Sequence, residues 1–294
     1  MANIRYSKIE NVFAVFNYIF LAIVAFACFY PMLYVLFASF SENNLILQHT
    51  GLLLMPKGFS TAAYNKVFKN PNIMMGYKNT IFLLVMGVLV CLLMTSLGAY
   101  FLSRKQVLFK RPIMMLITFT MFFSGGMIPF YLNLRDLHLT NSHWGLIIPF
   151  AISTYNMIIM RTSFSTIPDS LTEAAIIDGA GHFQILFRIV LPLSKAIIAV
   201  MVLYYGIGIW NAWFWASAIL RRRELYPLQV ILREILLQNS AIASSSGLDG
   251  VDQEAVSETI KYATIIVATV PVLCIYPFLQ KYFARGVMIG AIKE

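Results

Sequence analysis

Six stretches of this 294-residue chain contain no aspartate, glutamate, lysine, arginine or histidine. They are residues 13–40, 80–102, 113–132, 144–160, 196–220 and 262–280, and they are 17 to 28 residues long. An α-helix needs about 20 residues, within a range of roughly 17–25, to cross the hydrocarbon core of a bilayer. The stretches do not alternate polar and apolar residues, which is the pattern of a membrane β-barrel. The sequence therefore predicts an all-α integral membrane protein with six transmembrane helices.

The overall composition favours the same class. Hydrophobic residues make up 59% of the chain and charged residues 12%, whereas soluble domains carry roughly 25% charged residues. The net charge of +9 does not indicate a nucleic-acid-binding protein, because the basic residues lie at the ends of apolar runs and form no single stripe. Cys28, Cys91 and Cys274 lie inside apolar runs, so they predict neither a disulfide framework nor a metal site. We interpret residues 1–294 as one membrane domain.

The distribution of positive charge over the short loops predicts the orientation of the chain. Loop 103–112 carries four lysines and arginines, whereas loop 133–143 carries one arginine. Cytoplasmic loops are enriched in lysine and arginine, so we expect the first loop inside the cell and the second outside. With six spans, both termini and loop 161–195 are then cytoplasmic, and loops 41–79 and 221–261 are external.

Residues 165–195 (STIPDSLTEAAIIDGAGHFQILFRIVLPLSK) are unusual for a loop between two membrane spans. Pro168 can open a helix, and Ser170 with Glu173 has the spacing of a capping box. Leu171, Ala174, Ala175 and Asp178 would share one face of this helix, and Gly179 can end it. On physical grounds alone, such a projecting helix can enter a socket in a cytoplasmic partner or lie on lipid head groups.

The same loop contains a spaced motif. The order Glu173-Ala174-Ala175, three residues, Gly179, nine residues, Ile189, one residue, Leu191-Pro192 resembles the EAA motif of ABC importer permeases. In that family the loop forms a coupling helix, which docks into a groove on a separate ATPase subunit. The resemblance implies the type I ABC importer permease fold, with Glu173 as the charged contact to the ATPase. It also implies that Ala174 and Ala175 form a close-packed face, that Gly179 makes the turn, and that Asp178 caps or makes a further polar contact. For Glu173 and Gly179, plain helix capping is an alternative that can hold alongside the coupling role.

Four further segments resemble the carbohydrate-uptake branch of these permeases. They are 53–68 in the first external loop, 134–149 before span four, 210–215 in span five and the tail 280–294. His138 stands where that branch often has glycine. The resemblance implies a permease subunit for a carbohydrate, in particular an oligosaccharide, in the bacterial plasma membrane. The implied partners are a second, non-identical permease, a cytoplasmic ATPase dimer and an extracytoplasmic solute-binding protein facing loop 221–261. For that loop, a helix lying on the outer membrane surface is the alternative.

The chain contains no GxxxxGK[ST] phosphate-binding loop, so we expect ATP and Mg on the partner ATPase, no cofactor in this chain and no enzymatic activity of its own. An ion-coupled secondary transporter is the alternative function. Such proteins often place ionisable residues within their spans, and the six runs contain none, although sodium sites can also be built from carbonyl groups.

Candidates for the substrate path follow from the chemistry of sugars, which favour aromatic faces and neutral hydrogen-bonding groups. They are Tyr155, Asn156, Tyr204, Trp210, Asn211 and Trp213. Each has an alternative reading, because tyrosine and tryptophan populate interfacial belts and asparagine can join packed membrane helices.

Overall fold

The structure, a computed structural model, describes residues 8–245, 259–275 and 277. Within these ranges it is built of helices, with one isolated antiparallel bridge between Ser41 and Phe59 and no strand. The all-α class is therefore confirmed for this part of the chain. The predicted cytoplasmic tail 280–294, the N-terminal residues before Lys8 and part of external loop 221–261 lie outside the described residues. The chain divides into two compact units, residues 1–70 with 234–269 (unit 1) and residues 71–233 with 270–294 (unit 2).

Unit 1 contains three helices near the start of the chain: α1 (Lys8–Ser39), α2 (Asn43–Leu47) and α3 (Ala62–Lys69). Most of α14 (Leu228–Ser245) and of the apolar helix Thr259–Ile275 also belongs to it. Its small core is formed by Ala38, Ile46 and Leu53. The hydroxyl of Tyr30 accepts a hydrogen bond from the backbone N–H of Leu53 (2.9 Å), so the end of α1 is fixed to the following loop.

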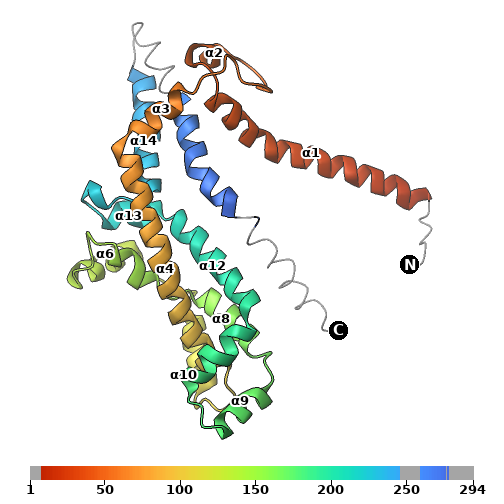
Figure 1. Cartoon of the computed structure of the whole chain (residues 1–294), viewed down its shortest axis with the longest axis vertical. Helices are drawn as coiled ribbons and strands as arrows, with labels where there is room; N and C mark the ends of the chain where they lie inside the picture. The colour runs from red at the N-terminus through yellow and green to blue at the C-terminus, as the bar shows by residue number, and fades with distance from the viewer. Residues whose placement is uncertain (1–7, 246–258, 276, 278–294) are drawn as a thin grey trace. The chain divides into compact units, whose positions relative to one another are not determined.

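Unit 2 is organised around α4 (Pro71–Ser103), against which α8 (Thr154–Phe164) and α12 (Lys195–Trp210) pack (Figure 1). The shared core consists of apolar side chains from these helices, including Cys91, Ala99, Met160, Phe164, Met201 and Tyr205. At one end of the unit, beyond the end of α4, lie α9 (Asp169–Ile177) and α10 (His182–Ile185) (Figure 1).

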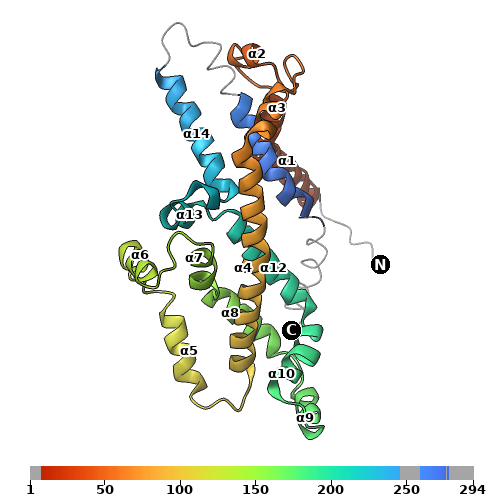
Figure 2. The same cartoon turned by 60° about the vertical axis from the view of Figure 1, so that its left-hand side comes forward.

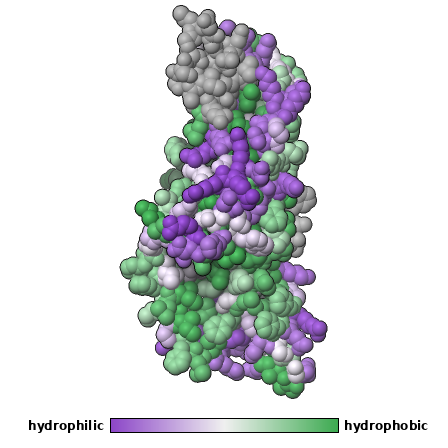
Figure 3. Space-filling view, turned by 90° about the vertical axis from the view of Figure 1, so that its left-hand side faces the viewer, coloured by the Kyte–Doolittle hydropathy of each residue, from purple (hydrophilic) through white to green (hydrophobic). Residues whose placement is uncertain are grey.

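Beside this three-helix core lie α5 (Lys110–Phe119) and α6 (Met127–Asp136) (Figure 2). Large apolar side chains are exposed along this stretch, among them Met115, Leu116, Phe119, Phe122 and Phe123. Figure 3 shows hydrophobic side chains gathered over this face of unit 2, with hydrophilic side chains below them. An exposed apolar surface of this kind is expected where a protein faces lipid or another chain.

Short helical segments connect these elements in unit 2. They are α7 (Trp144–Ile147), the 3-10 helix η1 (Ile148–Phe150), the π-helix η2 (Leu186–Val190), α11 (Leu191–Leu193), α13 (Trp213–Ile219) and the 3-10 helix η3 (Arg223–Leu225). Segments of this type often mark bends in longer helices.

Three of the six predicted runs are not continuous helices. Run 113–132 is broken between α5 and α6, run 144–160 between η1 and α8, and run 196–220 between α12 and α13. Each of these three ranges is therefore an interrupted helix in the structure. Hydropathy measures only composition, whereas the breaks depend on local backbone features such as Gly126, whose φ of +86° does not fit an α-helix.

Two described helices are long and apolar enough to cross a membrane, Val12–Ser39 and Pro71–Ser103. A third crossing is possible if His182–Leu193 and Lys195–Trp210, which meet at an angle of 88°, form one bent span. The helix Thr259–Ile275 is apolar but shorter.

Candidate functional site

The two ends of helix α9 are set by the backbone conformations of Pro168 and Gly179. Pro168, with φ −56° and ψ 133°, is the residue before its first turn, and no side chain caps this end, so the predicted capping box of Ser170 and Glu173 is wrong. At the other end Gly179 has φ +81°. Its N–H donates to the carbonyl of Ile176 and the N–H of Ala180 donates to the carbonyl of Ala175, both at 2.9 Å. These two bonds form a Schellman motif, which a left-handed glycine makes possible.

The two long faces of α9 have different surroundings. Thr172 and Ala175 are buried, and Ala175 is part of the core of unit 2. The outward face carries the exposed residues Leu171, Glu173, Ala174, Ile177 and Asp178. Ala174 is exposed whereas Ala175 is buried, so the two do not share the outward face that the sequence predicts for them. Ala175 packs inside the chain, whereas Glu173, Ala174, Asp178 and Gly179 remain accessible.

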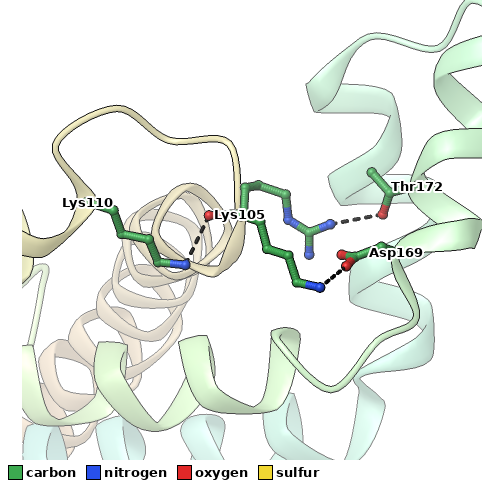
Figure 4. Close-up of polar contacts among 5 residues, drawn as sticks. Lys105, Lys110, Asp169 and Thr172 are labelled. Atoms are coloured by element: carbon green, nitrogen blue, oxygen red, sulfur yellow. Dashed lines mark hydrogen bonds and ion pairs between the residues drawn. The ribbon is translucent and has the colours of Figure 1, made fainter.

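Helix α9 is fixed to the end of α4 by two polar contacts (Figure 4). Arg104 donates from Nη1 to the hydroxyl of Thr172 at 2.9 Å, and its guanidinium lies over the ring of Tyr100 at 4.9 Å. Nζ of Lys105 lies 2.7 Å from Oδ2 of Asp169. These contacts join α9 to the residues that follow α4.

Electrostatics at this end of the unit favour the charged forms of the ion pair. The hydrogen bond from Lys105 holds the pKa of Asp169 below its usual value, and the same bond raises the pKa of Lys105. Partial burial, followed by the nearby Arg161 and Arg104, lowers the pKa of Lys110, whose ammonium donates to the Arg104 carbonyl at 3.0 Å. Both members of the ion pair are exposed to solvent, so the pair orients α9 more than it stabilises the fold.

A cavity of about 510 Å³ separates part of α9 from the end of α4. Residues of both helices and of the following segments line it, including Tyr100, Arg104, Lys105, Thr172, Glu173 and His182. The Tyr100 hydroxyl lies 3.2 Å from Nδ1 of His182. Helix α9 is thus held by directed contacts around a hollow on this side, in addition to the packing of Ala175 in the core.

A second cavity, of about 550 Å³, lies among α4, α8 and α12 in unit 2. Two predicted path residues, Asn156 and Tyr204, line it. Ser153, Tyr205 and Trp215 also line it, and the sequence analysis missed them. Trp215 could have been predicted to line the path from its place in the aromatic run 210–215, whereas nothing in the local sequence distinguishes Ser153.

The other predicted path residues lie elsewhere. Tyr155 is 58% exposed. Trp210 is buried, and its ring contacts that of Tyr77 at 6.5 Å. Asn211 is exposed at the break after α12, and Trp213 lies beneath the guanidinium of Arg233 at 4.2 Å. None of these four lines the cavity that holds Asn156 and Tyr204.

The break between η1 and α8 is bridged by one side chain from α12. The hydroxyl of Tyr205 accepts from the backbone N–H of Ser153 at 3.2 Å and lies 2.6 Å from the hydroxyl of Thr95 on α4. A broken helix frees backbone groups, and in an apolar interior these groups need partners. Tyr205 supplies one and thereby joins the three helices that surround the cavity.

Comparison with known proteins places this architecture in a family. The model of the family "Binding-protein-dependent transport system inner membrane component" matches residues 1–289. The polygalacturonan/rhamnogalacturonan transport system permease protein YtcP of Bacillus subtilis (strain 168) is 39% identical over 97% of this chain and 99% of its own length. The protein LplC of the same organism is 38% identical over 98% of this chain and 97% of its own length.

The same architecture occurs in a solved structure. A chain in the crystal structure of a bacterial ABC transporter involved in the import of the acidic polysaccharide alginate superposes with a TM-score of 0.86. It is 35% identical to this chain, and the match covers 95% of this chain and 99% of the other. The chain therefore belongs to the family of binding-protein-dependent transport system inner membrane components and is a permease subunit of an ABC transporter, not an enzyme.

Proposed function

We propose that this chain forms half of the translocation path of an ATP-driven importer of oligosaccharides. The names of its relatives support a carbohydrate cargo: besides the polygalacturonan/rhamnogalacturonan permease, they include permeases for diacetylchitobiose and for arabinooligosaccharides. The similar solved structure belongs to an importer of a polysaccharide. The ion-coupled secondary transporter considered from the sequence has no support among these relatives.

The proposed topology has six crossings with both termini in the cytoplasm. In it, α1, α4 and the helix Thr259–Ile275 are simple spans, and the three interrupted runs are discontinuous spans. Breaks at membrane depth are tolerated where protein groups satisfy the freed backbone, as Tyr205 does beside α8. Lys105 and Lys110 lie at the α9 end of unit 2 (Figure 4), and Arg104 contacts Thr172 of α9. This cluster of basic residues supports a cytoplasmic position for that end.

Helix α9 is the proposed coupling helix. The assignment rests on one observation: one face of α9 is attached within the chain, and the other face is exposed. Thr172 and Asp169 attach it to α4, while the outward face with Glu173, Ala174 and Ile177 has no covering within the described part of the chain. ATP-driven closure of the partner ATPases would displace α9, and the contact of Arg104 with Thr172 would pass the movement to α4. Since α4 also lines the 550 Å³ cavity, this movement changes the proposed path.

The proposed assembly comprises this chain, a second, non-identical permease, a cytoplasmic ATPase dimer that binds ATP and Mg, and an extracytoplasmic solute-binding protein. Dependence on a binding protein is part of the family description. In this assembly, Asn156 and Tyr204 line the path within the chain. The exposed Tyr155, Asn211 and Trp213 are proposed to face the path or the second permease, and Trp210 supports the path from behind.

Reconstitution of the complete transporter in proteoliposomes tests the proposal. Glu173→Ala should strongly reduce sugar-stimulated ATP hydrolysis and uptake, because a charged contact at a protein interface is removed. Asp136→Ala is the matched control, since Asp136 is also an exposed carboxylate but lies at the end of α6. If the wild-type complex hydrolyses ATP without any response to oligosaccharides, the assignment of a carbohydrate cargo is incorrect.

A further inference from the structure

The cavity among α4, α8 and α12 has the size and chemistry of a ligand site. Its volume of about 550 Å³ lies within the range of roughly 300–1,000 Å³ that is typical of small-molecule pockets. Its lining is mostly apolar, with a few neutral polar groups and no charged side chain among its described residues. Such a lining favours an uncharged ligand, because bringing a carboxylate into it would cost the hydration of the charge without supplying a partner.

The side-chain amide of Asn156 is the polar group in this cavity that lacks a partner. The residue is 93% buried, since only 7% of its surface is exposed, and it lines the cavity. Its backbone N–H donates to the hydroxyl of Ser153 at 3.4 Å, but within the described residues its amide has no hydrogen-bonding partner in the protein. Because Asn156 lines the cavity, a ligand there that both donates and accepts hydrogen bonds can pair with its amide.

The hydroxyl of Tyr205, another polar group that lines the cavity, already has partners. The Tyr205 hydroxyl contacts both Thr95 and the N–H of Ser153, so it forms a wall of the cavity and holds α8 in place. Trp215 supplies an apolar surface in the same cavity. Its ring is fixed in an aromatic cluster with Phe130 (4.7 Å between centroids) and Phe150 (5.8 Å), and it also lines the cavity.

We propose that this cavity is a subsite for one uncharged sugar unit of the transported oligosaccharide. In it, the amide of Asn156 hydrogen-bonds two sugar hydroxyls, and Trp215 covers the apolar face of the ring. A pyranose ring offers both of these features, hydroxyls that donate and accept and C–H groups on one face. This inference rests on the proposed import of carbohydrates and adds to it a site that residues of this chain form.

The first test is the uptake rate of the Asn156→Leu variant, in complete transporter with its solute-binding protein in proteoliposomes. Leucine nearly keeps the volume of the side chain and removes the amide. The maximal uptake rate of a neutral trisaccharide should fall about tenfold, the loss expected when one buried hydrogen-bonding partner is removed. The concentration for half-maximal uptake should change little, because the solute-binding protein sets it. Asn133→Leu is the control, since Asn133 is exposed on α6 and lies outside the cavity.

The second test does not depend on how well the Asn156 variant folds. Gly208 lines the cavity, and a Cβ added there meets no atom within 4 Å, so Gly208→Cys should fit. The variant is made after Cys28, Cys91 and Cys274 have been replaced by alanine, and its labelling by N-ethylmaleimide is followed during transport. Gly206→Cys on the same helix is the control, because its Cβ faces Leu84 at 3.7 Å and it does not line the cavity.

Wild-type uptake of galactotriose, arabinotriose and trigalacturonate is measured first, and the transported sugars are then used for protection. We expect a transported neutral trisaccharide to slow the labelling of position 208 at least about fivefold, with no effect at position 206. Equal protection by trigalacturonate, or no protection by any transported sugar, would overturn the subsite while leaving carbohydrate import intact. If the wild-type complex transports none of the three sugars, the carbohydrate proposal fails, and the subsite fails with it.

Discussion

Two substitutions of different severity at Gly179, alanine and proline, test whether the turn after α9 is needed for coupling to the ATPase. Alanine at this position would have to adopt the φ of +81°, at a cost of about 1–2 kcal/mol for an L-residue. No atom lies within 4 Å of the added Cβ, so this backbone strain is the whole effect. A strain of that size shifts the equilibrium between the native turn and its alternatives by about five- to thirtyfold.

Proline at the same position is a stronger perturbation. Proline fixes φ near −65° and removes the N–H that bonds to the carbonyl of Ile176. It also disfavours the helical conformation of Asp178, which precedes it and has φ −73° and ψ 3°. The Schellman motif cannot form, so α9 would no longer present its outward face in the same orientation.

The assay is oligosaccharide-stimulated ATP hydrolysis by the reconstituted transporter. We expect intermediate stimulation for Gly179→Ala and none for Gly179→Pro, while both variants still insert and assemble with the second permease. Gly181→Ala is the control, because Gly181 has an ordinary φ of −74° and open space around its Cβ. Full stimulation of the proline variant would refute the reasoning, since a helix without its turn would then still couple.

Three further predictions concern the attachment of α9. Arg104→Leu should reduce stimulated ATP hydrolysis more than Lys105→Ala, because Arg104 holds the buried Thr172 whereas Lys105 joins an exposed pair; equal losses in the ATPase assay would contradict this order. The difference in thermal unfolding midpoint between wild type and Asp169→Asn should be constant from about pH 5 to 9 and disappear on acidification. Because the pKa of Asp169 is lowered in the folded chain, its contribution to stability is complete above the ordinary pKa of about 3.9 and is lost as the pH falls through the folded pKa. The raised pKa of Lys105 preserves the ion pair at alkaline pH. Finally, Ala175→Leu should destabilise the chain by about 1–3 kcal/mol in a denaturation assay through overpacking, whereas Ala174→Leu should leave stability unchanged and lower the affinity for the ATPase in a pull-down.

Local signals in the sequence were sufficient for the long helices and for the turn after α9. Run 13–40 lies almost wholly within α1 (Lys8–Ser39), and run 80–102 lies inside α4 (Pro71–Ser103), so each of these two runs corresponds to a helix long enough to cross the bilayer. The glycine that follows α9 is likewise a local feature, since only its own backbone has to adopt the left-handed conformation.

Features set by distant residues could not be predicted in this way. The break before α8 persists because Tyr205, 52 residues further along the chain, satisfies the backbone of Ser153. Ala175 faces inward because Arg104, 68 residues before Thr172, holds that side of α9 against α4. The chemistry of Asn156 predicts a place on the path, and the structure adds that this residue lines a cavity. The same chemistry predicts Trp210 on the path, but this residue packs against Tyr77 and does not line the cavity.

Site-specific photo-crosslinking tests the coupling role of α9 most directly. Benzoylphenylalanine is introduced at Ile177, which is 85% exposed on the outward face of α9, or at Leu54, which is 62% exposed in the proposed external loop 41–79. After illumination of the complete transporter in its membrane, the crosslinked products are identified by mass spectrometry. We predict a crosslink from position 177 to the ATPase subunit and none to that subunit from position 54. Crosslinks from position 177 to lipid alone would contradict the account and would show that α9 lies on the membrane surface.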